Sequence, residues 1–132
     1  IMSKIDKYLI FEISGCLYGV DLKYILKIKN TTKFYKLPAI GEEYLGIIEL
    51  ENRFIPVYNF EHKYGLDNEE KNAVIFIRYR TNEFAILITN LLDIFDIQTE
   101  EIFFEKEKTF TYIDEKKACL INLEEITEEG VS

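Results

Sequence analysis

The chain has 132 residues, with 16 basic against 24 acidic side chains and a formal net charge of −8. Nucleic acid and anionic lipid are poor partners for such a chain, because phosphate binding needs a basic field. The length suits one compact domain over residues 1–132 that buries about two-thirds of its unfolded surface, without help from disulfides or metal.

Reactive residue types are few. Cys16 and Cys119 lack metal-type spacing; we expect two reduced thiols, with a disulfide between them as the open alternative. His62, the single histidine, lies in a charged stretch and suits a surface position better than a catalytic base. We therefore expect no metal and no cofactor. No apolar run approaches the ~20 residues of a membrane helix, and no charged leader precedes an apolar segment, so we expect a cytoplasmic protein without direct membrane insertion.

Apolar runs of strand length recur along the chain, most of them separated by short polar turns. In chain order these strand candidates are 8–13, 16–20, 34–37, 44–50, 54–58, 73–79, 84–88, 91–97, 111–113 and 118–123. A polar connection is expected over 98–108. This density of strand candidates predicts a mainly β protein.

Helical signals are short. Asp21 is a good N-cap, and three apolar residues of 22–26 follow it at i, i+3 and i+4 spacing, which predicts one or two turns of amphipathic helix, or a helical bend, that ends by residues 30–32. Asn59 can cap a second short piece that ends at Gly65. Residues 124–130 indicate a final helical turn, with an acidic, frayed tail over 127–132.

The middle of the chain, 37–60, contains the clearest hairpin. The apolar runs Tyr44–Leu50 and Phe54–Tyr58 flank three polar residues. Asn52, the middle one, tolerates a positive φ, which predicts a tight turn. Pro56 lacks an N–H, so we expect its strand to be a sheet edge or to carry a bulge there. Nothing in this stretch suggests catalytic chemistry, and we interpret it as a presented surface.

A faint internal repeat joins the two halves of the chain. Residues 11–28 and 77–94 share a strand, turn, strand, bend pattern, in which Leu26 corresponds to Leu92 and Ile28 to Ile94. Unrelated strand hairpins share part of this pattern, so a true duplication and a coincidence both stay open. A duplication predicts two similar small β-barrels, with approximate subdomains 8–66 and 72–126 that can exchange strands.

Four stretches occur in an order and spacing that together resemble one family. They are Tyr18-Gly19-Val20-Asp21 with Ile25 and Ile28; Leu37-Pro38 with Tyr44-Leu45-Gly46-Ile47-Ile48 and Ile55-Pro56-Val57; Ala85-Ile86-Leu87-Ile88-Thr89; and Leu120-Ile121-Asn122-Leu123-Glu124-Glu125-Ile126. Over residues 8–126 they resemble the CheW family, the scaffold that couples chemoreceptors to the histidine kinase CheA in bacterial chemotaxis.

The resemblance implies a fold of two five-stranded SH3-like β-barrels packed together, with one or two short helices. It also implies a non-catalytic adaptor at membrane-associated receptor arrays. One surface would hold the regulatory domain of a CheA-type kinase, and an apolar groove would take the helical tip of a chemoreceptor. The groove residues carried over by position, each with core packing as its alternative, are Ile25, Ile28, Phe84, Ala85 and Ile94. Gly46 and the segment containing Glu49, Glu51 and Asn52 would lie near kinase and receptor contacts.

The chain also departs from the family pattern at the hairpin. The family arginine is Glu51 here, the turn glycine is Asn52, and a glutamate of the first bend is Lys27. We hypothesise that Lys27 and Glu51 face one another as an ion pair of swapped polarity that sets partner specificity. The alternative is two independent surface charges.

Three other functions are alternatives to the adaptor. The same fold could localise an array or serve another two-component pathway, and the sequence does not separate this from coupling. A small-ligand β-barrel would need a closed apolar cavity. Catalysis is disfavoured, because the carboxylates lie in solvated runs, the single histidine has no credible triad, and no phosphate-binding loop is present.

Overall fold

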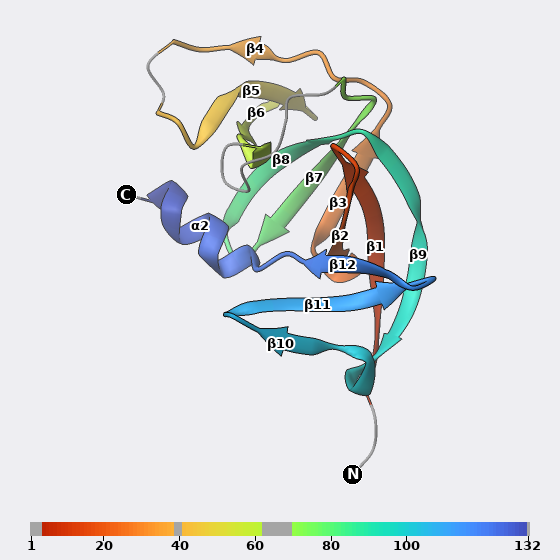
Figure 1. Ribbon diagram of the computed structural model, residues 1–132. Helices are drawn as coiled ribbons and strands as arrows, with labels where there is room; N and C mark the ends of the chain where they lie inside the picture. The colour runs from red at the N-terminus through yellow and green to blue at the C-terminus, as the bar shows by residue number, and fades with distance from the viewer. Residues whose placement is uncertain (1–3, 39–40, 62–69, 132) are drawn as a thin grey trace.

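The computed structural model describes residues 4–38, 41–61 and 70–131 of the chain. Most of them form two six-stranded sheets (Figure 1). The strands of sheet A, in spatial order, are β10 (Phe103–Glu105), β11 (Lys108–Ile113), β12 (Lys116–Leu120), β2 (Cys16–Asp21), β1 (Ile5–Ile13) and β9 (Asn90–Gln98). Those of sheet B are β3 (Ile25–Lys29), β7 (Ala73–Tyr79), β8 (Asn82–Ile88), β6 (Arg53–Tyr58), β5 (Tyr44–Leu50) and β4 (Tyr35–Lys36).

Helical structure is limited. Two short 3-10 turns, η1 (Leu22–Tyr24) and η2 (Thr99–Glu101), connect strands, and α2 (Leu123–Val131) closes the described chain. The expected mainly β fold of two packed units with short helices is confirmed, although each sheet has six strands rather than five. Among the described residues, no helix is long and apolar enough to cross a membrane.

The two sheets have the same internal arrangement. Sheet A runs β10-β11-β12-β2-β1-β9, and sheet B runs β4-β5-β6-β8-β7-β3 when read in the same sense. In each, a hairpin strand lies parallel beside the second strand of the repeat, as β12 beside β2 and β6 beside β8. The third strand of each repeat crosses to the other sheet, where β3 pairs with β7 and β9 pairs with β1. The internal repeat therefore has a structural counterpart, and both halves of the chain build both sheets.

The core follows from the side-chain alternation of strands. On β7, Ile75 and Ile77 belong to the largest apolar cluster, whereas Val74 and Phe76 belong to a second cluster on the opposite face. All four side chains are fully buried, which explains why β7 is a continuous apolar run rather than an alternating one. The largest cluster joins residues of both sheets and α2, so it holds the two halves together.

Tight hairpin turns confirm the expectation at 51–53. Glu51 and Asn52 have φ of 49° and 66°, so two consecutive residues are left-handed, as a two-residue turn that matches strand twist requires. The strands on either side are β5, which begins and ends where predicted, and β6, which begins one residue earlier, at Arg53. The β11–β12 turn has the same form at Asp114 and Glu115.

Three local predictions differ from the structure in whole or in part. The expected helix over 22–26 ends at Tyr24, and Ile25 begins β3, because pairing with β7 outweighs a short helical pattern; Asp21 does cap η1, accepting from the Lys23 N–H at 3.0 Å. The strand containing Pro56, β6, lies between β8 and β5 and is not an edge strand; the pair Val57–Ala85 joins it to β8. The bulge in the β5–β6 pairing lies on β5, and not at Pro56. The connection over 98–108 contains η2 and β10.

An ion pair joins Glu61 to Lys71. The Lys71 Nζ lies 2.5 Å from Glu61 Oε1, and the two side chains are only 8% and 17% exposed. Phe60 and Glu61 are helical, and Phe60 packs its ring edge-on against Tyr18 at 4.8 Å. The rest of the helical piece predicted to end at Gly65 lies outside the described residues. The acidic residues expected as a tail are helical through Val131, in α2.

Candidate partner-binding surfaces

Three of the predicted contact residues lie on β3, an edge strand of sheet B. Ile25 and Ile28 are half-buried and pack against the main core, whereas Lys27 is exposed. The pairing of β3 with β7 skips Leu26, which is an exposed bulge residue. Because a bulge re-aims side chains at a sheet edge, this aliphatic side chain points away from the core.

One of the two edge strands of sheet A, β9, carries a cluster of exposed aliphatic side chains. Leu91, Leu92 and Ile94 are 44%, 42% and 46% exposed, and all five residues from 90 to 94 are exposed. The pairing of β9 with β1 skips Leu92, which is therefore a bulge residue. Ile94 was predicted as a contact residue, whereas its two leucine neighbours were missed.

The bulged leucines Leu26 and Leu92 correspond in the internal repeat. Each lies on the third strand of its repeat, where that strand crosses to the other sheet. A signal for the missed residues was present in the sequence, since consecutive strand residues face opposite sides. When only one face of a strand is buried, one of two adjacent leucines on it must be exposed.

Three other predicted contact residues are buried. Phe84 and Ala85, on β8, belong to the two core clusters and are 3% and 0% exposed. Gly46 is buried where β4 crosses β5; a Cβ there would overlap the carbonyl oxygen of Tyr35 and lie 2.9 Å from its carbonyl carbon. None of these three residues presents a side chain at the surface of this structure.

The remaining predicted residues lie together on the β5–β6 hairpin. Glu49, Glu51 and Asn52 are all exposed. Beside them, Phe54 of β6 and Tyr35 of β4, the strands on either side of β5, are about equally exposed and place their rings edge-on at 6.2 Å. These two aromatic residues were not predicted, because an alternating strand normally places large aromatics inside. The hairpin end therefore combines carboxylates with an aromatic pair.

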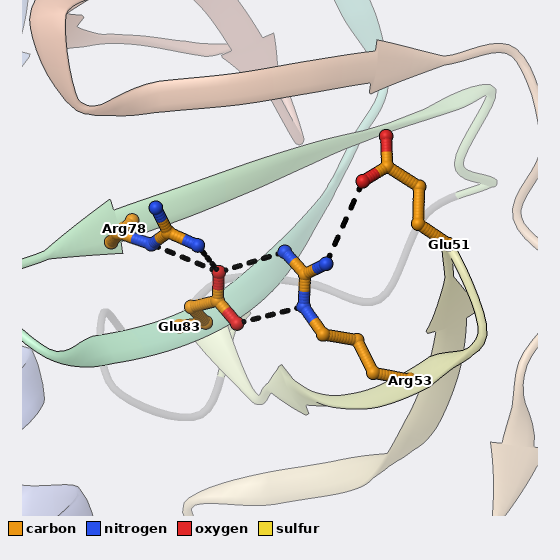
Figure 2. A network of polar contacts seen from close by, with 4 residues as sticks. All are labelled: Glu51, Arg53, Arg78 and Glu83. Atoms are coloured by element: carbon orange, nitrogen blue, oxygen red, sulfur yellow. Dashed lines mark hydrogen bonds and ion pairs between the residues drawn. The ribbon is translucent and has the colours of Figure 1, made fainter.

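A polar network fixes the base of this hairpin (Figure 2). Arg53 donates from Nε to Glu83 Oε1 at 3.0 Å and from Nη2 to Oε2 at 2.9 Å, and Arg78 donates to the same Oε2 at 2.6 Å and 3.0 Å. The Glu51 carboxylate lies 3.6 Å from Arg53 Nη1. The bidentate fork geometry joins the β5–β6 hairpin to the β7–β8 hairpin.

The expected Lys27–Glu51 ion pair is not formed. Glu51 pairs with Arg53, two residues away, and Lys27 takes part in no ion pair among the described residues. In sheet B three strands, β7, β8 and β6, separate β3 from β5. The two charge departures are independent of each other.

Protonation of Glu83 should weaken this network. Hydrogen bonds from Arg53, the strongest influence, and from Arg78 hold the pKa of the Glu83 carboxyl below its ordinary 4.5, against the opposing effect of burial. A carboxyl whose pKa is lowered by folding stabilises the fold above its unfolded pKa, and this stabilisation is lost as the pH falls through the folded pKa.

We therefore expect Glu83→Gln to lower the free energy of unfolding by about 1 kcal/mol at pH 7, since the network is partly solvated. The difference from the unsubstituted chain should shrink as the pH falls below 4.5. Urea unfolding at pH 7, 5, 4 and 3 measures it. A difference that stays constant with pH would assign the effect of the substitution to packing.

No metal-type cluster is found on the described surface. Among the residues that the structure describes, no group of three or more His, Cys, Asp or Glu side chains is placed to hold a metal ion. The features that stand out are the edge strand β9, the bulged β3 and the acidic hairpin end. Each suits protein contacts, because exposed apolar side chains beside charged ones are typical of interaction sites.

One family model matches the chain, and one solved structure has a similar fold. The family model described as CheW-like domain matches residues 7–129. Among solved structures, the chain is similar to the scaffolding protein TtCheW from Thermoanaerobacter tengcongensis, with a TM-score of 0.81 and 18% sequence identity over 90% of each chain. A comparison with curated proteins gave no match.

Proposed function

Since the chain belongs to the CheW-like domain family, we propose that it is a non-catalytic chemotaxis adaptor acting by protein–protein binding. Its partners are the regulatory domain of a CheA-type histidine kinase and the cytoplasmic tip of a chemoreceptor. It works in the cytoplasm, at membrane-associated receptor arrays, and acts stoichiometrically. The two partners use different surfaces, so one copy can hold both.

The observation that carries this proposal is the exposed stretch 90–94 on β9. Leu91, Leu92 and Ile94 are large aliphatic side chains that a protein without a partner would leave in water. Burying one such side chain contributes roughly 1–2 kcal/mol when it is already half covered. A receptor tip is helical, and one apolar face of a helix is the kind of surface that these side chains would cover.

The acidic hairpin end affects which kinase or receptor is bound. Glu51 stands where the family has an arginine, and its neighbour Arg53 is engaged with Glu83. A partner built to meet an arginine would meet repulsion here. We therefore propose that the partner facing Glu49 and Glu51 carries basic side chains. A divergent scaffold for a dedicated receptor, or for another two-component pathway, is the variant of this function that the hairpin favours.

Replacing Leu92 by aspartate tests the β9 surface. We expect Leu92→Asp to weaken binding of the receptor tip at least tenfold, because a charge replaces an aliphatic contact, while thermal stability stays unchanged at this exposed bulge. Isothermal titration calorimetry measures the dissociation constant for the receptor tip. A tip concentration of ~50 μM lies above the micromolar dissociation constants at which such a scaffold should work.

The matched control is Phe104→Asp, since Phe104 is also an exposed apolar residue of sheet A but lies on the opposite edge strand, β10. It should bind as the unsubstituted chain does. Equal losses in both variants, or no loss in Leu92→Asp, would remove β9 from the receptor surface. Failure of the unsubstituted chain to bind receptor tip or kinase domain would remove the adaptor function.

A further inference from the structure

A half-open cleft lies on one face of sheet A, away from β9. Its volume is about 640 Å³, and it is lined from β2, β10, β11, β12 and the turns that join β1 to β2 and β10 to β11. In the strand order of the sheet, β1 separates these strands from β9. The cleft is therefore distinct from the surface proposed for the receptor.

The lysines of the turns beside this cleft line it, whereas most acidic side chains of the same turns do not. Four acids and four lysines lie on the two turns that border the cleft, within residues 105–108 and 114–117. All four lysines line it, whereas Glu105 is the one acid of these turns that does so. The lining lysines are Lys106, Lys108, Lys116 and Lys117. In a chain of net charge −8, this is a local basic rim.

The floor of the cleft is apolar. Phe110 and Tyr18 are nearly buried, and the Cys119 side chain lies between their strands. The Nζ of Lys117 lies 4.1 Å from the centre of the Phe110 ring, so that a cation already covers part of the floor. Burial raises the pKa of the Cys119 thiol; the nearby charges of Lys108 and Lys117 oppose this effect, and the carboxylate of Glu125 adds to it. Two lysine charges thus lie near the floor.

The corresponding place in sheet B is smaller and narrower. There, β5, β6 and β8 line a cavity of only about 200 Å³, into which Ile126 and Thr127 of α2 project as lining residues. At the positions of Cys16 and Leu17 in the repeat, sheet B has Asn82 and Glu83, and Glu83 is held by two arginines. The open cleft is therefore a property of sheet A and not a consequence of the fold.

We propose that the sheet A cleft binds a small organic anion, a carboxylate on an apolar body. Its volume lies in the range of small-molecule sites, which pair an apolar lining with a few charged groups. An apolar body of about ten carbons would cover the Phe110 and Tyr18 floor. The carboxylate would lie among the lysines of the rim, with Lys117 moving from the ring to the ligand. Such a ligand would make the adaptor responsive to a metabolite.

Dodecanoate below its micelle concentration is a suitable probe. By titration calorimetry we expect a dissociation constant on the order of 10–100 μM, given the ligand's size. Lys108→Gln combined with Lys117→Gln should weaken binding about tenfold. The control is Lys33→Gln combined with Lys36→Gln, which changes the net charge by the same amount. Lys36 lies on β4, an edge strand of the other sheet, and Lys33 lies just before it, so dodecanoate binding should be unchanged. Arginine at positions 108 and 117 should preserve binding.

A second readout separates this site from a general effect. Alkylation of Cys16, which lines the cleft and is exposed, should slow when dodecanoate is bound in a Cys119→Ser background. Dodecyltrimethylammonium, with the same tail and the opposite charge, should neither bind nor protect. Equal binding of both amphiphiles, equal effects of the two double variants, or binding to phosphatidylglycerol vesicles alone would overturn the proposal. None of these results bears on kinase or receptor binding.

Discussion

Replacing Gly46 by alanine is expected to lower the free energy of unfolding by about 2–3 kcal/mol, a large effect for one methyl group. The added Cβ would overlap the carbonyl oxygen of Tyr35 and lie 3.0 Å from Cδ2 of Phe34. Because the overlapped atom belongs to the backbone, no side-chain rotation can relieve the overlap. The strand β4 must therefore separate from β5. Urea unfolding followed by circular dichroism measures the change.

Gly15→Ala is the matched control. Gly15 has a φ of +82° but open space around its Cβ position, so only backbone strain of about 1 kcal/mol is expected. We expect Gly46→Ala to be the more damaging of the two. If Gly46→Ala is as stable as the unsubstituted chain and only partner binding falls, Gly46 is a contact residue, as the family resemblance implied, and the close approach of β4 is wrong.

Replacing Lys71 by methionine is expected to destabilise the fold by about 3 kcal/mol. The substitution leaves the Glu61 carboxylate largely buried and without its cation, which costs more than the ion pair itself stabilises. Glu61 is already poorly satisfied, since its buried Oε2 has no hydrogen-bond partner within the described structure. Thermal and urea unfolding at pH 7 measure the loss.

The double variant Glu61→Leu with Lys71→Met controls for packing. Replacing both charges by apolar groups of similar size is often neutral, because neither charge is then left unpaired. We expect its stability to lie within about 1 kcal/mol of the unsubstituted chain. A double variant as unstable as Lys71→Met would mean that the aliphatic part of the lysine, and not the charge, stabilises this region.

The strands were predictable where burial determines them. β5 and β7 have the predicted bounds, because each is an apolar run between polar turns. β3 was taken for a helix, since its apolar spacing fits a helical face and the bulge at Leu26 breaks strand alternation. β10 was missed because it is exposed along its length and is defined only by its pairing with β11.

The candidate site was less predictable than the fold. Ile94 is exposed as expected, but family position alone could not show that Phe84 and Ala85 face the core. The Lys27–Glu51 pairing failed for the same reason, since charge reversal in the sequence carries no information on distance. Glu51 lies beside Arg53 instead, and Arg53 in turn binds Glu83, a residue of another hairpin that is 30 positions away in the sequence. Such contacts depend on which strands become neighbours, and single-sequence patterns do not specify that.

The most direct test of the adaptor function is sedimentation velocity of the chain mixed with a CheA-type regulatory domain and a chemoreceptor tip, each at ~50 μM, well above micromolar affinities. Coupling requires both partners on one copy at once. We predict a complex that contains all three components and that loses the receptor tip when Leu92 is replaced by aspartate. Binding to neither partner, or displacement of one partner by the other, would contradict it.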